Sequence, residues 1–503
     1  MNPRLRSRLS VLSTLLLGAG LAGCVVQPQV LTPEQREATA RADRQSMFAD
    51  QEPVTGPITL EEAMARAIKY NLDQRVKLME AAVAQRQLDL SRLDLLPKLT
   101  AAAGYSNRDD VLAESSRDVV THQQSLVPST STDKEVKTAD LTLSWNVLDF
   151  GVGYYSARQQ ADRTLVAEER RRQVLHMLMQ QTRQAYWQAA GAQLLDSRIE
   201  PVLKSAREAL ADSRKVEVEK LRSPLEALNY QRQLLDIVRQ LESVRDELAK
   251  AKPRLASIMN LEPGQPLTVV VPDTLAVPQV AMPLPAMEQT ALVRRPEVVE
   301  AQYNERIGVL ETRKAMARLF PGLEISTGAH YDSNSYLVNH QWGDVGLRVS
   351  WNLFNLLSAT QIRGEAQAQL DLAHEQRLAL NMAVLTQVHL AELDYQAQLR
   401  QFELTQQTNT VDQRILQYTR SAATADAQGK LEEIRASAAA MMSELRLYQS
   451  FGALQGAYGQ VIAALGLDPL PQSVPSEDLK TLSQAVSASE SDWTKIVSPG
   501  GGA

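Results

Sequence analysis

Four segments of the chain alternate between apolar and polar side chains with a period of two. Residues 141–147, 323–331 and 345–353 alternate cleanly, and 99–105 forms a weaker fourth segment. A period of two with one apolar face is the pattern of a β-strand. The alternation therefore predicts strands near 98–106, 139–149, 322–331 and 344–354.

The rest of the pattern is helical. Between 234 and 258 the apolar positions follow 3,4 spacing over four heptads, which indicates a coiled-coil helix: Leu234, Ile237, Leu241, Val244, Leu248, Ala251, Leu255 and Ile258. Residues 154–221 carry no strand signal, and a helix of that length extends roughly 100 Å, with a bend expected at Pro201. Segments 61–96 and 225–260 would each extend about 54 Å, so two of them end to end match the long helix.

The sequence contains an internal duplication. Segment 144–150 reads SWNVLDF and segment 350–355 reads SWNLFN, at an offset of 206 residues, and Leu225-Glu226 matches Leu431-Glu432 at the same offset. Upstream, Pro97 matches Pro321 at an offset of 224, so one insertion of 224 − 206 = 18 residues lies between Pro97 and Trp145. Repetition at a constant offset indicates two structural repeats, each a helix–strand–strand–helix unit.

These patterns predict a domain organisation in six parts. They are a signal peptide at 1–23, a polar tether at 24–56, a first repeat at 57–261, a Pro-rich connector at 262–285 with a short strand near 268–271, a second repeat at 286–467, and a C-terminal segment at 468–503 with a disordered end.

The N-terminus resembles the signal of a bacterial lipoprotein. Arg4, Arg6 and Arg8 precede an apolar run of 13 residues at 9–21, which is too short to span a bilayer but suits a signal peptide. The run ends in Leu21-Ala22-Gly23-Cys24, and Cys24 is the single cysteine of the chain. We expect diacylglyceryl and N-acyl lipid on Cys24; the alternative is a secreted protein with a chance cysteine. Val25 in the next position favours the outer membrane.

Composition excludes several functions. The net charge is −6 without a basic block, which argues against a nucleic-acid partner. One cysteine rules out an internal disulfide framework, and the sequence lacks nucleotide-binding, serine-hydrolase and zinc-protease motifs. We therefore expect no enzyme activity, no cofactor and no metal site. His176, Met177, Met179 and the pair Met441-Met442 suggest soft-metal contacts, but methionine in a helix is more often core filler.

The strand count has consequences for assembly. Outside the signal peptide no stretch approaches 18 apolar residues, so a mature chain that crosses a membrane must do so as β-structure. Four strands cannot close a barrel, whereas two chains give eight strands and three give twelve, with room for an aqueous lumen. Aromatic side chains at the strand–helix junctions suit a membrane-interface girdle: Trp145, Phe150, Tyr154, Trp351 and Phe354. The alternative is a soluble sheet of two hairpins.

The doubled unit, the WNVLDFG segment at 145–151, the Leu-Glu pairs at 225 and 431 and the LGLDP segment at 465–469 together resemble the TolC family of outer-membrane export ducts. The resemblance covers roughly residues 57–470. It implies a mainly α protein with a membrane β-barrel: a homotrimer with a 12-strand barrel continued by a long α-helical coiled-coil periplasmic tunnel. It also implies a place in the outer membrane of a Gram-negative bacterium, with a periplasmic adaptor protein and an inner-membrane pump, ABC or proton-driven, as partners.

The family also implies a charged constriction at the tunnel tips, which here read 219–226 and 425–432. Acidic positions are kept at Glu226 and Glu432, while the glycine of the family's turn is replaced. We expect Glu226, Glu432 and Asp426 to form the constriction, with Arg222 or Arg420 pairing the glutamates. The alternative is that these are solvated acids at helix starts, favoured by the helix dipole.

The function expected from the resemblance is passive conduction of substrate in a tripartite efflux or type I-like secretion system. The presence of only one aromatic residue, Phe48, in 25–56 slightly favours secretion. The alternative is a lipid-anchored periplasmic coiled-coil scaffold without a pore. It explains the lipoprotein signal and the heptads but not the four alternating segments.

Overall fold

The computed structural model describes residues 28–125, 127–219, 223–272, 274–422, 427–471 and 474–498. The chain divides into two compact units, Met1–Gln51 and Glu52–Ala503. Cys24, and with it the expected lipid site, lies outside the described residues, as do Arg222 and Asp426. In the described part no helix combines the length and the apolar character needed to cross a bilayer.

The first unit contains one helix that the sequence pattern did not predict. Helix α2 (Pro33–Met47) begins with a capping box, in which Thr32 Oγ1 accepts from the Gln35 amide and the Gln35 side chain accepts from the Thr32 amide. No residue of α2 is buried within the chain. The predicted tether is thus polar as expected but partly helical, because local capping suffices to start a helix without an apolar face.

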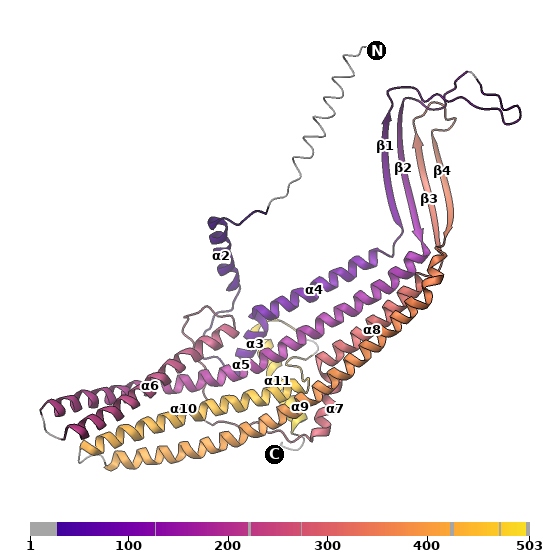
Figure 1. Cartoon of the computed structure of the whole chain (residues 1–503). Helices are drawn as coiled ribbons and strands as arrows, with labels where there is room; N and C mark the ends of the chain where they lie inside the picture. The colour runs from indigo at the N-terminus through magenta and orange to yellow at the C-terminus, as the bar shows by residue number, and fades with distance from the viewer. Residues whose placement is uncertain are drawn as a thin grey trace. The chain divides into compact units, whose positions relative to one another are not determined.

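The second unit is built from the duplicated element order that the sequence predicts (Figure 1). The first copy comprises α3 (Leu60–Tyr70), α4 (Leu72–Leu93), β1 (Lys98–Asn107), β2 (Glu135–Asn146), α5 (Val147–Val218) and α6 (Pro224–Ile258). The second comprises α7 (Leu284–Arg294), α8 (Pro296–Ala317), β3 (Gly322–Asp332), β4 (Gln341–Ser350), α9 (Phe354–Ala422) and α10 (Ala427–Ala464). Pro201 lies inside α5, and the bend expected there stays a prediction.

The duplication extends to single backbone conformations. Asn260 after α6 and Gly466 after α10 are 206 residues apart, and both adopt a positive φ, 56° and 69° respectively. In each case the next amide bonds back to a carbonyl five residues earlier, from Leu261 to Ala256 and from Leu467 to Ile462. This is how a left-handed residue closes a helix C-terminus.

The strands form one antiparallel sheet in the order β1-β2-β3-β4. Asn107 pairs with Glu135 at one end of the first hairpin, and Tyr331 pairs with Gln341 in the second. The inserted residues lie in the long loop 108–134, whereas the loop 333–340 is short. Asp133 and Ser335 join the two loops by a hydrogen bond of 2.9 Å between Oδ1 and Oγ.

Both boundaries of two strands differ from the prediction. β2 and β4 begin at Glu135 and Gln341 rather than near 139 and 344, because backbone pairing starts before the apolar alternation does. They end at Asn146 and Ser350 rather than near 149 and 354. Asn146 Oδ1 accepts from the amides of Leu148 and Asp149 and so starts α5, and Asn352 Oδ1 accepts from Phe354 at the start of α9.

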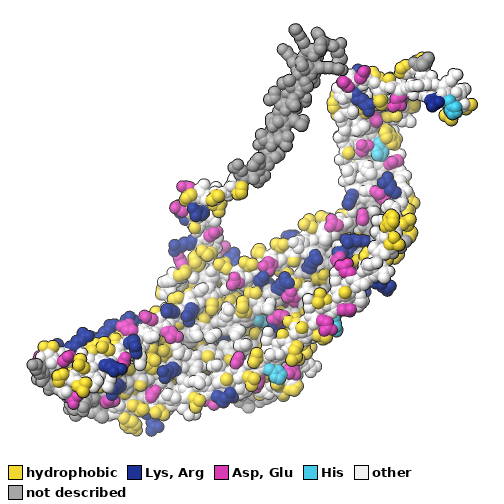
Figure 2. Space-filling model, viewed as in Figure 1, with side chains coloured by type: hydrophobic (Ala, Val, Ile, Leu, Met, Phe, Trp, Pro, Cys, Tyr) yellow, Lys and Arg dark blue, Asp and Glu magenta, His cyan; other side chains and the backbone are white. Residues whose placement is uncertain are grey.

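The long helices pack side by side and continue from one end of the sheet (Figure 1). α5 lies against α4, α6, α8 and α10, and α9 lies against α7, α8 and α10. The sheet lies at one end of the long helices, and the C-terminal ends of α5 and α9 lie at the other (Figure 1). Figure 2 shows charged side chains of both signs spread along the helices, with hydrophobic ones gathered where the sheet meets them.

The predicted heptad of α6 forms a packed seam. Leu234, Leu241, Val244, Leu248, Ala251 and Leu255 are buried, while Ile237 and Ile258 are partly buried against the same clusters. The corresponding face of α10 is rich in small residues, and Gly191 of α5 shows how closely the helices approach. A Cβ at Gly191 would lie 2.5 Å from the Tyr448 Cβ.

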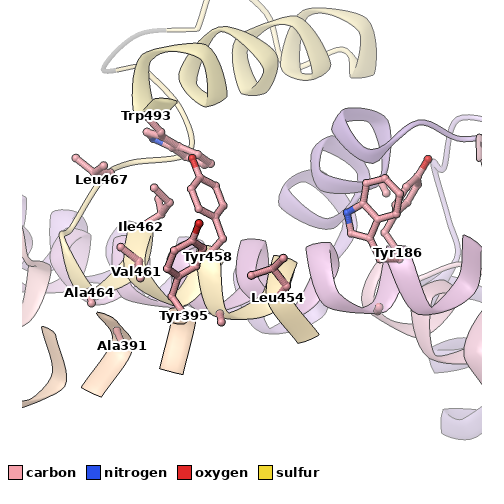
Figure 3. Packing of buried hydrophobic residues seen from close by; sticks show 14 of the residues in the cluster. Tyr186, Ala391, Tyr395, Leu454, Tyr458, Val461, Ile462, Ala464, Leu467 and Trp493 are labelled. Atoms are coloured by element: carbon pink, nitrogen blue, oxygen red, sulfur yellow. The ribbon is translucent and has the colours of Figure 1, made fainter. Parts of the chain in front are cut away.

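The largest hydrophobic cluster lies midway along the helices. Trp187 meets Phe451 edge-on, with ring centroids 4.7 Å apart, and Phe451 also contacts Phe402. In Figure 3, Trp493 points from above towards Tyr458, which lies beside Tyr395. Trp493 belongs to α11 (Leu479–Val497), a helix that sequence reasoning missed, and residues 499–503 lie outside the described part.

The Pro-rich connector is irregular, as expected, but the short strand predicted near 268–271 is reduced to a single bridge. Val269 pairs in parallel with Ile58. The Gln193 side chain of α5 completes the pairing, accepting from the Val269 amide at 2.9 Å and donating to its carbonyl at 2.8 Å. The Gln193 side chain thus takes the place of a second strand partner, and the bridge does not extend into a strand of several residues.

Candidate functional site

The sheet has one apolar face and one polar face, and much of both is solvent-accessible in the single chain. The apolar face carries Leu141, Leu143, Ile325, Val345, Leu347 and Val349, all exposed. Leu347 has 71% of its surface accessible. The register places polar residues on the opposite face, such as Thr142 beside Gly328 and Ser144 beside Ser326. A large exposed apolar face requires an apolar environment or a partner.

A charged cluster lies on the polar face of the sheet. His330 Nδ1 lies 2.7 Å from Asp140 Oδ1, and His330 Nε2 lies 3.2 Å from Asp344 Oδ1. The His330 ring also stacks on Trp342, with centroids 5.4 Å apart. Sequence reasoning missed this cluster, because Asp140 and His330 become neighbours only through the β2–β3 register.

The predicted interface aromatics lie at the strand–helix junctions. The Trp145 and Phe150 rings meet edge-on, with centroids 5.6 Å apart. The Arg158 guanidinium lies over the Tyr154 ring, with its Cζ 5.9 Å from the ring centroid. Trp351 Nε1 donates to the Leu319 carbonyl at 3.0 Å, and Phe354 is exposed. Tyr154 and Trp351 thus combine apolar surface with a polar contact, an arrangement typical of aromatic residues at a boundary between water and lipid.

Of the predicted constriction residues, Glu226 and Glu432 are described, and both lie near the ends of the long helices that are far from the sheet. Glu226 is exposed in the first turn of α6. Glu432 is also exposed and pairs with Arg435 one turn along α10, at 2.6 Å. Of the two arginines expected to pair the glutamates, Arg222 lies outside the described residues, and Arg420 approaches Glu433, at 3.9 Å, rather than Glu432. Glu226 lies in the first turn of α6, where the helix dipole favours an acid, whereas Glu432 lies beyond the first turn of α10.

A second charged cluster joins α5 to the residues that follow α10. Arg172 donates to both carboxylate oxygens of Asp468 at 3.0 Å, and His176 Nε2 lies 3.0 Å from Asp468 Oδ1. Trp493 Nε1 donates to the Asp468 carbonyl at 3.0 Å. Burial acts to raise the pKa of the Asp468 carboxyl, but hydrogen bonds from His176 and Arg172 outweigh it and hold that pKa below its usual range.

The suggested soft-metal side chains do not gather into one site. Met179 and Met441 are buried in different hydrophobic clusters, and His176 bonds to Asp468. Within the described ranges, no group of three or more His, Cys, Asp or Glu side chains is arranged to hold a metal ion. Met179 and Met441 are packing residues, whereas Met177 is exposed.

Solved structures with the same architecture define the class of the fold. The CmeC outer membrane channel of Campylobacter jejuni matches with a TM-score of 0.64 at 14% identity, covering 88% of this chain and 94% of that one. CusC, described as forming a transmembrane channel, matches at 0.62 and 18% identity over 84% and 96%, and the outer-membrane channel OprN at 0.61 and 20% over 81% and 89%. The chain has the fold of TolC-family outer-membrane channels, as the sequence resemblance predicted.

Sequence comparison adds one curated relative. Residues of this chain are 27% identical over 281 positions to a probable outer membrane lipoprotein, SilC of Salmonella typhimurium. The match spans 53% of this chain and 54% of that relative, so about half the length of the relative is covered. No family model matches the chain.

Proposed function

We propose that the chain is one subunit of a homotrimeric outer-membrane channel that passively conducts substrate out of the cell. The observation that carries the proposal is the open sheet, which has an exposed apolar face, a polar face and two unpaired edges. The alternative, a coiled-coil scaffold without a pore, does not account for such a sheet.

The sheet edges support assembly. In the described part of the chain, β1 and β4 are each paired on one side only. Unpaired strand edges in lipid are too costly to persist, so β4 of one copy would pair with β1 of the next. Three copies give twelve strands, enough to close a barrel around water, with the polar face inside and the apolar face towards lipid.

Exposed apolar residues on the helices also support assembly of several copies. The outermost helices α4 and α9 carry exposed apolar residues at heptad-like spacing: Leu72, Val76, Met79, Val83 and Leu90 on α4, and Leu404, Val411, Ile415 and Tyr418 on α9. Apolar seams of this kind are typical of helices that pack against another helix. The α4 seam lies beside the start of α5 and the α9 seam lies beside α10 nearer the tips, so in a ring each seam would pack against a different helix of the neighbouring copy.

The N-terminal signal supports an anchor in the outer membrane. We propose that Cys24 carries diacylglyceryl and N-acyl lipid, so that the mature chain is held in the outer membrane by its lipid as well as by the sheet. The relative in Salmonella typhimurium is itself described as a probable outer membrane lipoprotein. The helices then extend into the periplasm, where a periplasmic adaptor and an inner-membrane pump, ABC or proton-driven, supply the substrate of an efflux or type I-like secretion system.

The helix tips are the proposed constriction. Glu226 and Glu432 carry it, with Asp426 and Arg222 as further members. Glu432 is exposed and its partner Arg435 lies on the same helix, so the pair contributes only about 0.3–0.5 kcal/mol to stability. An effect of Glu432 on conductance would therefore reflect the path of ions rather than folding.

Conductance in planar lipid bilayers tests the proposed function. The purified, lipidated protein should give discrete conductance steps, and Glu432→Lys should shift ion selectivity towards anions without changing thermal stability. Glu433→Lys is the matched control, because Glu433 faces Arg420. A preparation that is folded and membrane-bound but gives no conductance steps would favour the scaffold. Unchanged selectivity in Glu432→Lys would remove Glu432 from the constriction.

A further inference from the structure

An apolar groove lies between helices α5 and α8, where they meet the sheet. Its walls come from the start of α5 and from the end of α8 with the first residues of β3, and it encloses about 520 Å³. Val147, Leu148, Met316, Phe320 and Leu323 provide most of the apolar wall. A concave apolar site of this volume lies within the range of small-ligand sites.

One end of the groove carries an exposed arginine side chain. Arg313 of α8 lines the groove and is exposed. Among the described residues, no carboxylate lies within salt-bridge distance of its guanidinium. An arginine at the mouth of an apolar groove matches a ligand with one apolar part and one anionic part.

The order of these groups along the molecule is directional. Arg313 precedes Ala317 by one helical turn and Phe320 by about two turns, and α8 leads towards β3. The charge therefore lies on the helix side of the groove, and Leu323 lies on the sheet side, in line with the exposed apolar face. If the sheet crosses the outer membrane, this is the order of a lipid in the inner leaflet, with its headgroup towards the periplasm.

Assembly would leave the groove open. α5 and α8 lie between α4 and α9, which flank them. The groove is thus in the middle of each chain, away from the edges at which neighbouring copies would meet.

We propose that this groove binds a membrane glycerophospholipid, with an acyl chain along the apolar wall and the phosphate on Arg313. The proposal rests on the proposed function, since it needs the sheet to lie in the outer membrane. The bound lipid would fill the junction between barrel and helices and fix the depth of each chain in the bilayer.

The chain offers substitutions that block the groove without straining the fold. Gly151 lines the groove, and a Cβ there would have no atom within 4 Å. Gly151→Leu fills the groove while replacing a helical glycine with a better helix former. Gly364→Leu in α9 is its matched control, because a Cβ at Gly364 also meets open space. Arg313→Gln removes the charge, and Arg318→Gln, which removes an exposed arginine that lines a different pocket, is the control for charge.

Native mass spectrometry of the full-length protein, extracted in detergent from outer membranes, measures the bound phospholipid directly. The wild type and both controls should keep about one phospholipid per chain, Gly151→Leu should lose it, and Arg313→Gln should retain it about tenfold more weakly. Equal retention in all five proteins would overturn the groove as the site. Loss of the bound lipid in Cys24→Ser would also overturn it, since the occupant would then be the chain's own anchor.

Conductance of the same preparations separates the two proposals. Normal conductance with equal lipid retention in all variants would refute only the groove. Absence of conductance in the wild type would refute the channel, whatever lipid is bound.

Discussion

Asp140, His330 and Asp344 place two carboxylates around one imidazole on the polar face of the sheet. In the proposed trimer that face lines the water-filled barrel, so three copies would place six carboxylates around the path. Fixed carboxylates in a confined aqueous path attract cations and repel anions.

Asp344→Asn should therefore lower the preference of the channel for cations over anions. The reversal potential in a potassium chloride gradient measures that preference, and a shift towards zero by several millivolts is the expected result at low salt, where screening is weakest. Glu114→Gln, in the long loop outside the strands, removes the same charge away from the sheet. Equal shifts in both variants would show that Asp344 does not act locally.

The other charged cluster, around Asp468, contributes to the stability of the fold. Because its folded pKa is lowered, this carboxylate stabilises the fold above its ordinary pKa of 3.8, and the contribution is lost as the pH falls through the lower, folded value. The Asp468 side chain is 42% exposed, so screening limits the effect to about 1 kcal/mol or less.

Asp468→Asn should lower the melting temperature at pH 7 and flatten its decline below pH 4. Thermal unfolding in detergent at both pH values measures this, with Asp492→Asn as the control, since Asp492 pairs with Lys495 on the surface of α11. If the wild type and Asp468→Asn lose the same stability on acidification, the Asp468 cluster contributes nothing to acid sensitivity.

At the scale of helices and strands, the close approach of α5 to α10 depends on one glycine. A Cβ at Gly191 would lie 2.5 Å from the Tyr448 Cβ and 2.9 Å from its Cγ, so either the ring or a helix must move. Small residues at such a crossing allow two long helices to pack with little space between them.

Gly191→Ala should destabilise the protein by about 1–3 kcal/mol despite the better helix propensity of alanine. Gly364→Ala should be neutral or slightly stabilising, because its Cβ would meet open space. Denaturant unfolding of the detergent-solubilised protein compares the two. A Gly191→Ala protein as stable as Gly364→Ala would mean that α5 and α10 are not held at this distance.

Elements with a strong period could be predicted from the sequence. The four strands, the α6 heptad and the duplicated order follow from alternation and from constant offsets, and the structure has them. The helices α2 and α11 were missed. α2 starts from a capping box alone. α11 lies in a Ser-rich segment, which does not suggest a helix by composition. Asp478 nevertheless caps it, and its buried residues follow helical spacing: Leu479, Leu482, Val486, Trp493 and Val497.

Sites that need a register could not be predicted. His330 lies 190 residues from Asp140, and only the pairing of β2 with β3 brings them together. The constriction residues were chosen by resemblance. Glu432 pairs with Arg435 of its own helix and Arg420 approaches Glu433, whereas Arg222 and Asp426 lie outside the described residues, so the constriction stays a prediction.

For the whole molecule, the single chain is an incomplete structure. In the described residues its sheet has two unpaired edges, and its flanking helices carry exposed apolar seams. The proposed ring of identical copies would satisfy both features together, and three copies supply twelve strands, enough to close a barrel around water.

The mass of the native particle tests this account most directly. The full-length protein is extracted in mild detergent from the outer-membrane fraction, and light scattering coupled to size exclusion separates the mass of protein from that of detergent. The account predicts three mature chains per particle. A monomer or dimer that stays soluble and folded without detergent would contradict it.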